Sequence, residues 1–214
     1  MPPRLIESPP LPQDLTPSQQ ARRARIVAAG LALLREDDYD KIQMRDVAVE
    51  AEVAIGTVYH YFQSKEHLFA EVLAEWAVSL RGHVERSPLR GQTSAARLRK
   101  VLHRSVRAFQ SWPQLVRVLM TLEASTDPFA SEIFARMNGS IQTIWAEALA
   151  GLPDEVIDIV VKVAGATLDL LLRQWVMGRM SINEVYDQIE RAVTVLLEFQ
   201  DDHAQDDHPQ NDHA

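Results

Sequence analysis

Residues 43–67 read QMRDVAVEAEVAIGTVYHYFQSKEH, and this stretch decides the fold. Apolar residues recur at helical spacing over 44–51 and again over 55–62, which predicts two short helices joined by a turn. Isolated helices shorter than about 12 residues are marginal in water. A longer helix must therefore pack against this pair, and residues 17–36 supply it, beginning with the capping-box sequence Thr16-Pro17-Ser18-Gln19.

The third helix of this unit, over 55–62, carries two kinds of side chain. Val58 and Phe62 suit an inward face, and the polar and aromatic residues around them cannot all be buried as well. A three-helix unit with one short, exposed helix fits the major groove of DNA, which is about 12 Å wide. Outward hydroxyl groups suit phosphate oxygens, and Lys65 adds a cation at the start of the next helix. We therefore expect an outward-facing group made of Thr57, Tyr59, His60 and Tyr61.

The rest of the chain also repeats apolar residues at the helical period, and no stretch alternates in the manner of a strand. The predicted class is all-α, with nine helices. A fourth helix begins at Ser64 and ends before Gly82, and Gly and Pro residues divide the remainder into five more. These five are expected over 94–111, 114–124, 129–149, 154–177 and 181–199.

Both ends of the chain differ in composition from the middle. Residues 1–16 are rich in proline, which predicts a disordered, mobile arm. Residues 201–214 carry Asp and His but no large aliphatic side chain, which predicts a disordered acidic tail rather than a metal site. Between them we expect a three-helix domain over 17–67 and a larger helical domain over 68–200.

Charge and composition restrict the function. The 214 residues have a formal net charge of −8, so any contact with nucleic acid must be local; Arg22, Arg23 and Arg25 either supply a local positive field or form a solvated helix face. There is no cysteine, no apolar run long enough to span a membrane and no phosphate-binding glycine loop. His83 and His103 have no carboxylate or second ligand at a spacing typical of a catalytic or metal site. We therefore expect a cytoplasmic protein that is not an enzyme and holds no metal or cofactor.

The motif over 43–68 resembles the DNA-binding domain of the TetR-type bacterial transcriptional repressors, and the chain length and nine-helix layout agree with that family. Residues 43–45 and 53–68 are also similar to the actinobacterial repressors of sterol catabolism. Two positions depart from the family pattern: Gln43 stands where a hydroxyl residue is common, and Ile55 can meet a thymine methyl group but donates no hydrogen bond. The resemblance is carried by Gln43-Met44-Arg45-Asp46-Val47-Ala48, Ala51, Val53, Gly56-Thr57-Val58-Tyr59, Phe62, Ser64-Lys65 and Leu68.

This resemblance implies a helix-turn-helix domain over 17–67 that binds double-stranded, palindromic operator DNA. Thr57 and His60 would lie at base edges, and the other contacts would go mainly to the phosphate backbone. The residues expected at DNA are Gln43, Arg45, Ile55, Thr57, Tyr59, His60, Tyr61 and Lys65.

The resemblance further implies that 68–200 binds an effector and forms a homodimer through helices 154–177 and 181–199. The first of these helices is apolar nearly all round, so it is expected to be buried on more than one side, and the second would add Ile182, Val185, Ile189, Val193 and Leu196. An apolar pocket lining favours a small hydrophobic effector. The lining expected is Leu98, Leu102, Val106, Phe109, Trp112, Met120, Phe134, Met137, Trp145, Leu168 and Trp175.

Two other interpretations stay open at this point. An all-helical carrier of lipids or other hydrophobic ligands, or an all-helical enzyme, would use the apolar interior without binding DNA. An activator would differ from a repressor only in the position of its operator. A hydrophobic ligand that co-purifies with a protein unable to bind DNA would favour the first.

Overall fold

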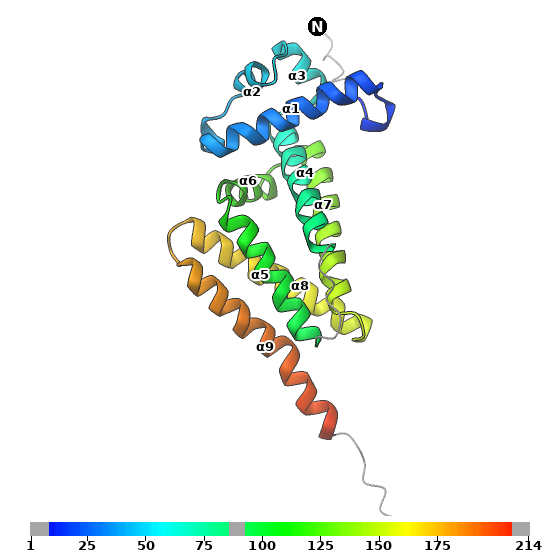
Figure 1. Ribbon diagram of the computed structural model, residues 1–214, viewed down its shortest axis with the longest axis vertical. Coiled ribbons are helices and arrows are strands. Elements are labelled where there is room, and N and C mark those ends of the chain that lie inside the picture. The colour runs from blue at the N-terminus through cyan, green and yellow to red at the C-terminus, as the bar shows by residue number, and fades with distance from the viewer. Residues whose placement is uncertain (1–8, 86–92, 207–214) are drawn as a thin grey trace, which may run out of the picture. The chain divides into compact units, whose positions relative to one another are not determined.

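The computed structural model describes residues 9–85 and 93–206, with the side chains described over 9–78 and 93–197. Within these residues it contains nine α-helices and two short 3-10 helices, and no strand, as the sequence predicts (Figure 1). The α-helices are α1 (Pro17–Glu36), α2 (Met44–Glu50), α3 (Ile55–Tyr61), α4 (Lys65–Glu85), α5 (Ser94–Gln110), α6 (Gln114–Glu123), α7 (Pro128–Ala148), α8 (Asp154–Val176) and α9 (Ile182–Asp206), and the 3-10 helices are η1 (Pro12–Asp14) and η2 (Tyr39–Lys41).

The predicted start of α1 is confirmed by its capping geometry. The Thr16 N–H donates to Gln19 Oε1 over 2.8 Å, and the Gln19 N–H donates to Thr16 Oγ1 over 3.4 Å. Two N–H groups that lack partners within the helix are thereby satisfied. The start of α4 is capped in the same manner, because the His67 N–H donates to Ser64 Oγ over 2.9 Å.

The N-terminal arm is shorter than the sequence indicates. Residues 12–14 form η1, and Leu15 is buried. The Gln20 side-chain amide donates to the carbonyl oxygens of Pro12 and Leu15 and holds this turn against α1. Prolines exclude an α-helix here but allow a 3-10 turn whose carbonyls accept from a neighbouring side chain. Residues 1–8 of the expected arm lie outside the described residues.

Two helices end later than predicted. Helix α4 continues past Gly82 to Glu85, and α9 continues to Asp206, so residues 201–206 of the expected disordered tail are helical. Once a helix is formed, each added residue gains a hydrogen bond, so extension does not require burial of its side chains. The remaining tail residues, 207–214, lie outside the described part of the chain.

The chain divides into two units, each with its own core. The first comprises residues 1–78 and 114–137, so the predicted boundary at 67/68 falls inside α4. Its core includes Ile26, Phe62 and Phe69, and Gly30 allows α1 to approach α4 closely: a Cβ at Gly30 would lie 3.0 Å from Val72 Cγ2. A larger side chain there would overpack the core.

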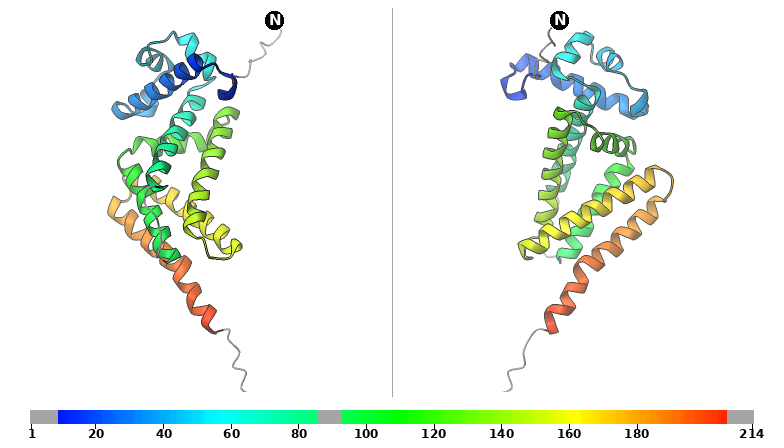
Figure 2. Two further views of the ribbon diagram at one scale, coloured as in Figure 1. Left: turned by 45° about the vertical axis from the view of Figure 1, so that its right-hand side comes forward. Right: turned by 180° about the vertical axis from the view of Figure 1, so that it is seen from behind.

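The second unit comprises residues 79–113 and 138–214. Helices α8 and α9 form a hairpin, and α9 also packs along α5 (Figure 2). Arg97 of α5 donates to the carbonyl oxygens of Ala148 and Ala150 over 2.6 and 2.7 Å, and so satisfies acceptors at the end of α7. Within this unit α7 also packs on α8, because Trp145 lies beside Gly165.

Candidate nucleic-acid interface

Helices α2 and α3 are joined by a turn that hydrogen bonds to α2. The Ala51 N–H donates to the Val47 carbonyl oxygen, and the Val53 N–H donates to the Ala48 carbonyl oxygen. Between these residues Glu52 adopts φ = +53°, a conformation that side-chain-bearing residues rarely occupy. Val47 and Val58 are fully buried, so α2 and α3 are held together by their apolar faces.

The outer face of α3 presents the side chains that the sequence predicts there, with one exception. Ile55 is 43% exposed and Tyr59 48% exposed, His60 is also exposed, and Thr57 is half-buried. Tyr61, by contrast, is 2% exposed, so the expectation that it stands outward is wrong. Tyr61 lies three residues after Val58 and next to Phe62, which places it on the inward stripe of the helix.

Two further predicted residues lie at the start of α2. Gln43 is exposed, and its N–H donates to Asp46 Oδ2 over 2.8 Å. Arg45 is 74% exposed, and its Nε lies 3.7 Å from Asp46 Oδ1, too far for a strong hydrogen bond. The guanidinium group of Arg45 is therefore presented to solvent.

Lys65 has a different environment from the one expected. Its Nζ donates a hydrogen bond to the Tyr39 carbonyl oxygen and lies 4.0 Å from the centroid of the Tyr39 ring. Burial lowers the pKa of Lys65, and the carboxylates of Asp40, Glu66 and Asp46 partly oppose that shift. Tyr39 carries no sequence signal for this role, because nothing in a single sequence shows that η2 meets the start of α4.

Arg23 of α1 contacts both Phe62, which follows α3, and Glu71 of α4. The Arg23 guanidinium lies 5.0 Å from the centroid of the Phe62 ring, and its Nη2 lies 2.9 Å from Glu71 Oε1. Both members of that ion pair are largely buried. Arg23 is therefore not part of an exposed positive field, whereas Arg22 and Arg25 are exposed.

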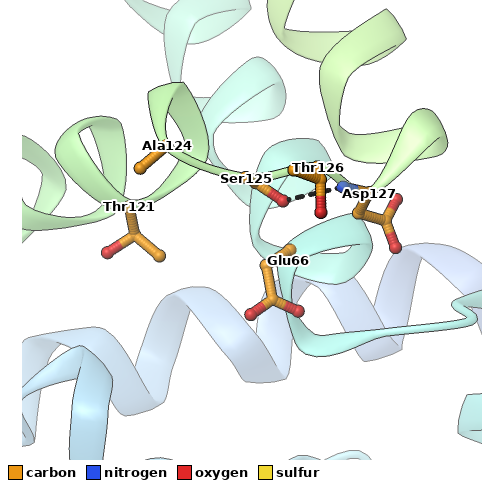
Figure 3. Close-up of a pocket in the computed structure, with 6 residues that line it drawn as sticks. All are labelled: Glu66, Thr121, Ala124, Ser125, Thr126 and Asp127. Carbon is orange, nitrogen blue, oxygen red and sulfur yellow. Dashed lines mark hydrogen bonds between the residues drawn. The ribbon is translucent and has the colours of Figure 1, made fainter.

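The structure also has an open hollow of about 680 Å³ in the first unit, between the start of α4 and the α6–α7 connection (Figure 3). Glu66 and Asp127 extend their carboxylates beside it, and the Asp127 N–H donates to Ser125 Oγ over 3.1 Å (Figure 3). Its lining is polar: Glu66, Thr121, Ala124, Ser125, Thr126 and Asp127.

None of the residues predicted to line an effector pocket borders this hollow. They are divided between the two units, with three in the first unit and eight in the second. The buried members are Leu98, Leu102, Val106, Phe109, Met137, Trp145 and Leu168, and the half-buried members are Trp112, Met120, Phe134 and Trp175.

Helix α8 exposes an apolar stripe. The stripe consists of Ile159, Val163 and Leu170 and continues at Met177, the C-cap of the helix; these residues are 59, 42, 56 and 44% exposed and lie four or seven residues apart. This is the spacing of a helix that packs against another helix. On α9 the expectation is wrong for three residues, because Val185, Ile189 and Val193 are buried within their own chain. Helix α9 packs against both α5 and α8 of its own chain.

His103 has a partner that the sequence spacing does not reveal. Its Nε2 lies 2.8 Å from Glu190 Oε1, and Arg99 Nε lies 2.7 Å from the other carboxylate oxygen of Glu190. His103 therefore has a carboxylate partner in space, although no carboxylate stands at a typical spacing from it in the sequence, since α5 and α9 bring the two together. The side chain of His83 lies outside the described ones.

Within the described residues, no three or more His, Cys, Asp or Glu side chains are grouped in a way that would hold a metal ion. In the same part of the chain, no helix has the length and apolar character needed to cross a membrane.

Comparisons with known proteins agree with this geometry. The profile of the tetR family of bacterial regulatory proteins matches residues 26–72, and that of the tetracyclin repressor-like C-terminal domain matches residues 91–196. The HTH-type transcriptional repressor KstR of Mycobacterium tuberculosis is 31% identical over 185 residues, which cover 86% of this chain and 84% of that protein.

Solved structures show the same fold. A TetR transcriptional regulator from Rhodococcus sp. RHA1 superposes with a TM-score of 0.71 at 27% identity, covering 84% of this chain and 97% of that one. The regulator FadR from Bacillus subtilis, solved in complex with stearoyl-CoA, superposes with a TM-score of 0.63 at 18% identity, covering 79% and 96%.

Proposed function

Because the chain belongs to the TetR family of bacterial regulatory proteins, we propose that it is a dimeric transcriptional repressor that binds a palindromic operator and is released from it by a small hydrophobic effector. The repressor role is supported by the relatives, which are named transcriptional repressors. The observation that carries DNA binding is the two-sided character of α3: Val58, Tyr61 and the C-cap residue Phe62 are buried, while Ile55, Tyr59 and His60 are exposed.

The proposed DNA contacts follow from this exposure. Thr57 and His60 read base edges, and Ile55 meets a thymine methyl group. Gln43, Arg45 and Tyr59 contact the phosphate backbone, which takes most hydrogen bonds in protein–DNA complexes. Lys65 and Tyr61 instead support the reading surface from within, because the ammonium group of Lys65 is engaged by Tyr39 and Tyr61 is buried.

Dimerisation supplies the second reading helix. We assign the interface to the apolar stripe of α8, with Val195 of α9, which is 60% exposed, as a further contact. Burial of apolar side chains drives association, and obligate interfaces are more apolar than the rest of the surface. Two copies of α3 about one DNA turn apart, roughly 34–36 Å, would read the two halves of a palindrome.

The residues expected to line the effector pocket indicate the class of effector. They include five aromatic side chains of high apolar area and few polar groups, which disfavours a sugar or an amino acid. The FadR neighbour bound to stearoyl-CoA supports a ligand with a long apolar part. Such an effector would bind more tightly to the conformation that cannot bind the operator. The coupling between effector binding and operator binding would then lower operator affinity, typically by about 5- to 150-fold.

The test is DNA selection followed by equilibrium binding. A duplex selected from a random-sequence library should bind at least about 1,000-fold more tightly than a random duplex, with an affinity that falls steeply as salt rises. Stearoyl-CoA and a steroid serve as effector probes in the same assay. Selection that yields no preferred sequence at low salt would contradict the proposal.

Side-chain variants refine that test. Tyr59→Phe should lower the affinity for all DNA sequences alike, whereas His60→Ala should change which base is preferred in the operator. Gln188→Ala, at an exposed position of α9, is the matched control and should change neither.

A further inference from the structure

Two residues of α4, His67 and Glu71, connect the three-helix unit to α7: His67 contacts Phe62 and Gln63, which follow α3, and Glu71 contacts α1. They lie four residues apart, so they share one face of α4. Their partners on α7, Phe129 and Arg136, lie seven residues apart and likewise share a face. Figures 1 and 2 show α4 running beside the N-terminal part of α7.

His67 is buried, whereas Glu71 is half-buried. The imidazole stacks on the Phe129 ring, with centroids 5.2 Å apart and planes 23° from parallel. The imidazole also meets the Phe62 ring edge-on at 5.3 Å, and its Nδ1 accepts a hydrogen bond from the Gln63 N–H over 3.2 Å. His67 is 5% exposed, so this contact excludes water. Phe62 and Gln63 directly follow α3, so His67 fixes the end of the reading helix.

The Glu71 contacts form a second, weaker connection. Glu71 Oε1 lies 2.9 Å from Arg23 Nη2 of α1 and 3.8 Å from Arg136 Nη2 of α7. Arg23 in turn lies over the Phe62 ring. Arg136 is 62% exposed, so its pairing with Glu71 is screened by solvent and contributes less than the His67 stack.

From these contacts we infer that His67 is the positioning residue through which α7 controls the reading helix, acting by its stack on Phe129. This inference rests on the proposed function. Helix α7 continues into the second unit, where Trp145 packs beside Gly165 of α8. A change in the second unit that moves α7 displaces Phe129, and the buried imidazole transmits that displacement to Phe62 and Gln63.

The coupling is reciprocal, so it can be measured without knowing the effector. The probe is the selected operator duplex, with a random duplex as reference, and the readout is amide hydrogen exchange of the free and DNA-bound protein. In the wild type, operator binding should slow exchange in residues 128–137 by about threefold or more, although α7 contributes no proposed DNA contact. In Phe129→Ala that slowing should be lost, while the slowing in α3 remains.

Three further variants distinguish a loss of the ring contact from a loss of folding. Phe129→Tyr keeps a ring against the imidazole and should retain the response of α7. Phe129→Leu keeps apolar volume without a ring and should lose it, which covers the case in which Phe129→Ala does not fold. Glu132→Ala, at an exposed position of α7, is the control and should respond like the wild type.

The outcomes are distinct from those of the proposed function. Operator binding that slows exchange in α3 but leaves residues 128–137 unchanged in the wild type overturns this inference alone. A response of α7 that survives in both Phe129→Ala and Phe129→Leu also overturns it. Failure to select any preferred duplex overturns the proposed function instead.

Discussion

The ammonium group of Lys65 lies over the ring of Tyr39, 4.0 Å from its centroid, and donates to the carbonyl oxygen of the same residue. Tyr39 is itself 4% exposed, and its ring meets Phe69 edge-on at 5.1 Å. Lys65 therefore ties the loop between α1 and α2 to the start of α4. This relationship gives Lys65 a structural role in place of the phosphate contact that the sequence suggests.

We expect Lys65→Met to lower the free energy of unfolding by about 1–2 kcal/mol, because it removes a hydrogen bond and a cation–π contact. The salt dependence of operator binding should stay unchanged. In contrast, Arg45→Gln should leave stability unchanged and reduce the salt slope by about one. Urea unfolding and salt titrations check both variants. A reduced salt slope with unchanged stability in Lys65→Met would restore its assignment to phosphate.

The left-handed backbone at Glu52 predicts that glycine is favoured there. A side chain at this φ destabilises the folded state by about 1–2 kcal/mol. Glycine removes this strain, but its greater conformational freedom in the unfolded chain offsets part of the gain. Glu52→Gly should therefore stabilise the protein by about 0.5–1 kcal/mol in thermal or urea unfolding. Glu52→Gln removes the charge but keeps the strain, so it should not reproduce the gain. Equal stabilisation by both variants would assign the effect to charge.

The buried imidazole of His67 predicts a dependence of stability on pH. Burial lowers the pKa of His67 below its ordinary value of 6.5; Asp127 and Glu71 oppose that shift, and Arg23 adds to it. The unfolded chain therefore binds more protons than the native protein as pH falls through 6.5. The contribution of the neutral His67 to the free energy of unfolding is complete above that pH and is lost progressively below it. Protonation would also place a donor on Nδ1 against the Gln63 N–H.

Between pH 7.5 and 5.5 we expect the wild type to lose more stability than His67→Gln, which does not titrate, by at most about 1.4 kcal/mol. Urea unfolding at the two pH values measures this difference, and contributions from other groups cancel in the comparison. Identical pH dependence in the two proteins would show that His67 does not titrate differently in the native state.

The exposed stripe of α8 predicts the effect of a charge placed in it. Leu170→Asp should convert a dimer to a monomer in sedimentation experiments, because it would bury an unpaired carboxylate in an apolar interface. Operator affinity should then fall by about 100-fold or more, since a single reading helix loses the benefit of paired binding. Val78→Asp, at a position of α4 that is 65% exposed, is the control and should remain dimeric.

The helices of this protein were predictable because each is specified locally. Capping sequences at Thr16 and Ser64 mark helix starts, and apolar periodicity marks the helical segments up to α9. The ends of α4 and α9 were not predictable, because helix extension beyond the last packed residue leaves no periodic signal.

The candidate DNA-binding surface was predictable in part for the same reason. Exposure of Tyr59 and His60 follows from the helical period once Val58 and Phe62 are placed inward. The period also places Tyr61 inward, although its phenol hydroxyl favours an outward interpretation.

The amino-acid sequence by itself determined that the chain is all-α, where its helices start and which face of α3 is polar, because these depend on neighbours within a turn or two. Only the tertiary structure decided that Lys65 meets Tyr39, that His67 lies between Phe62 and Phe129, and that His103 pairs with Glu190. Each of those contacts joins separate elements, and such pairings depend on how whole helices pack, which local spacing does not encode.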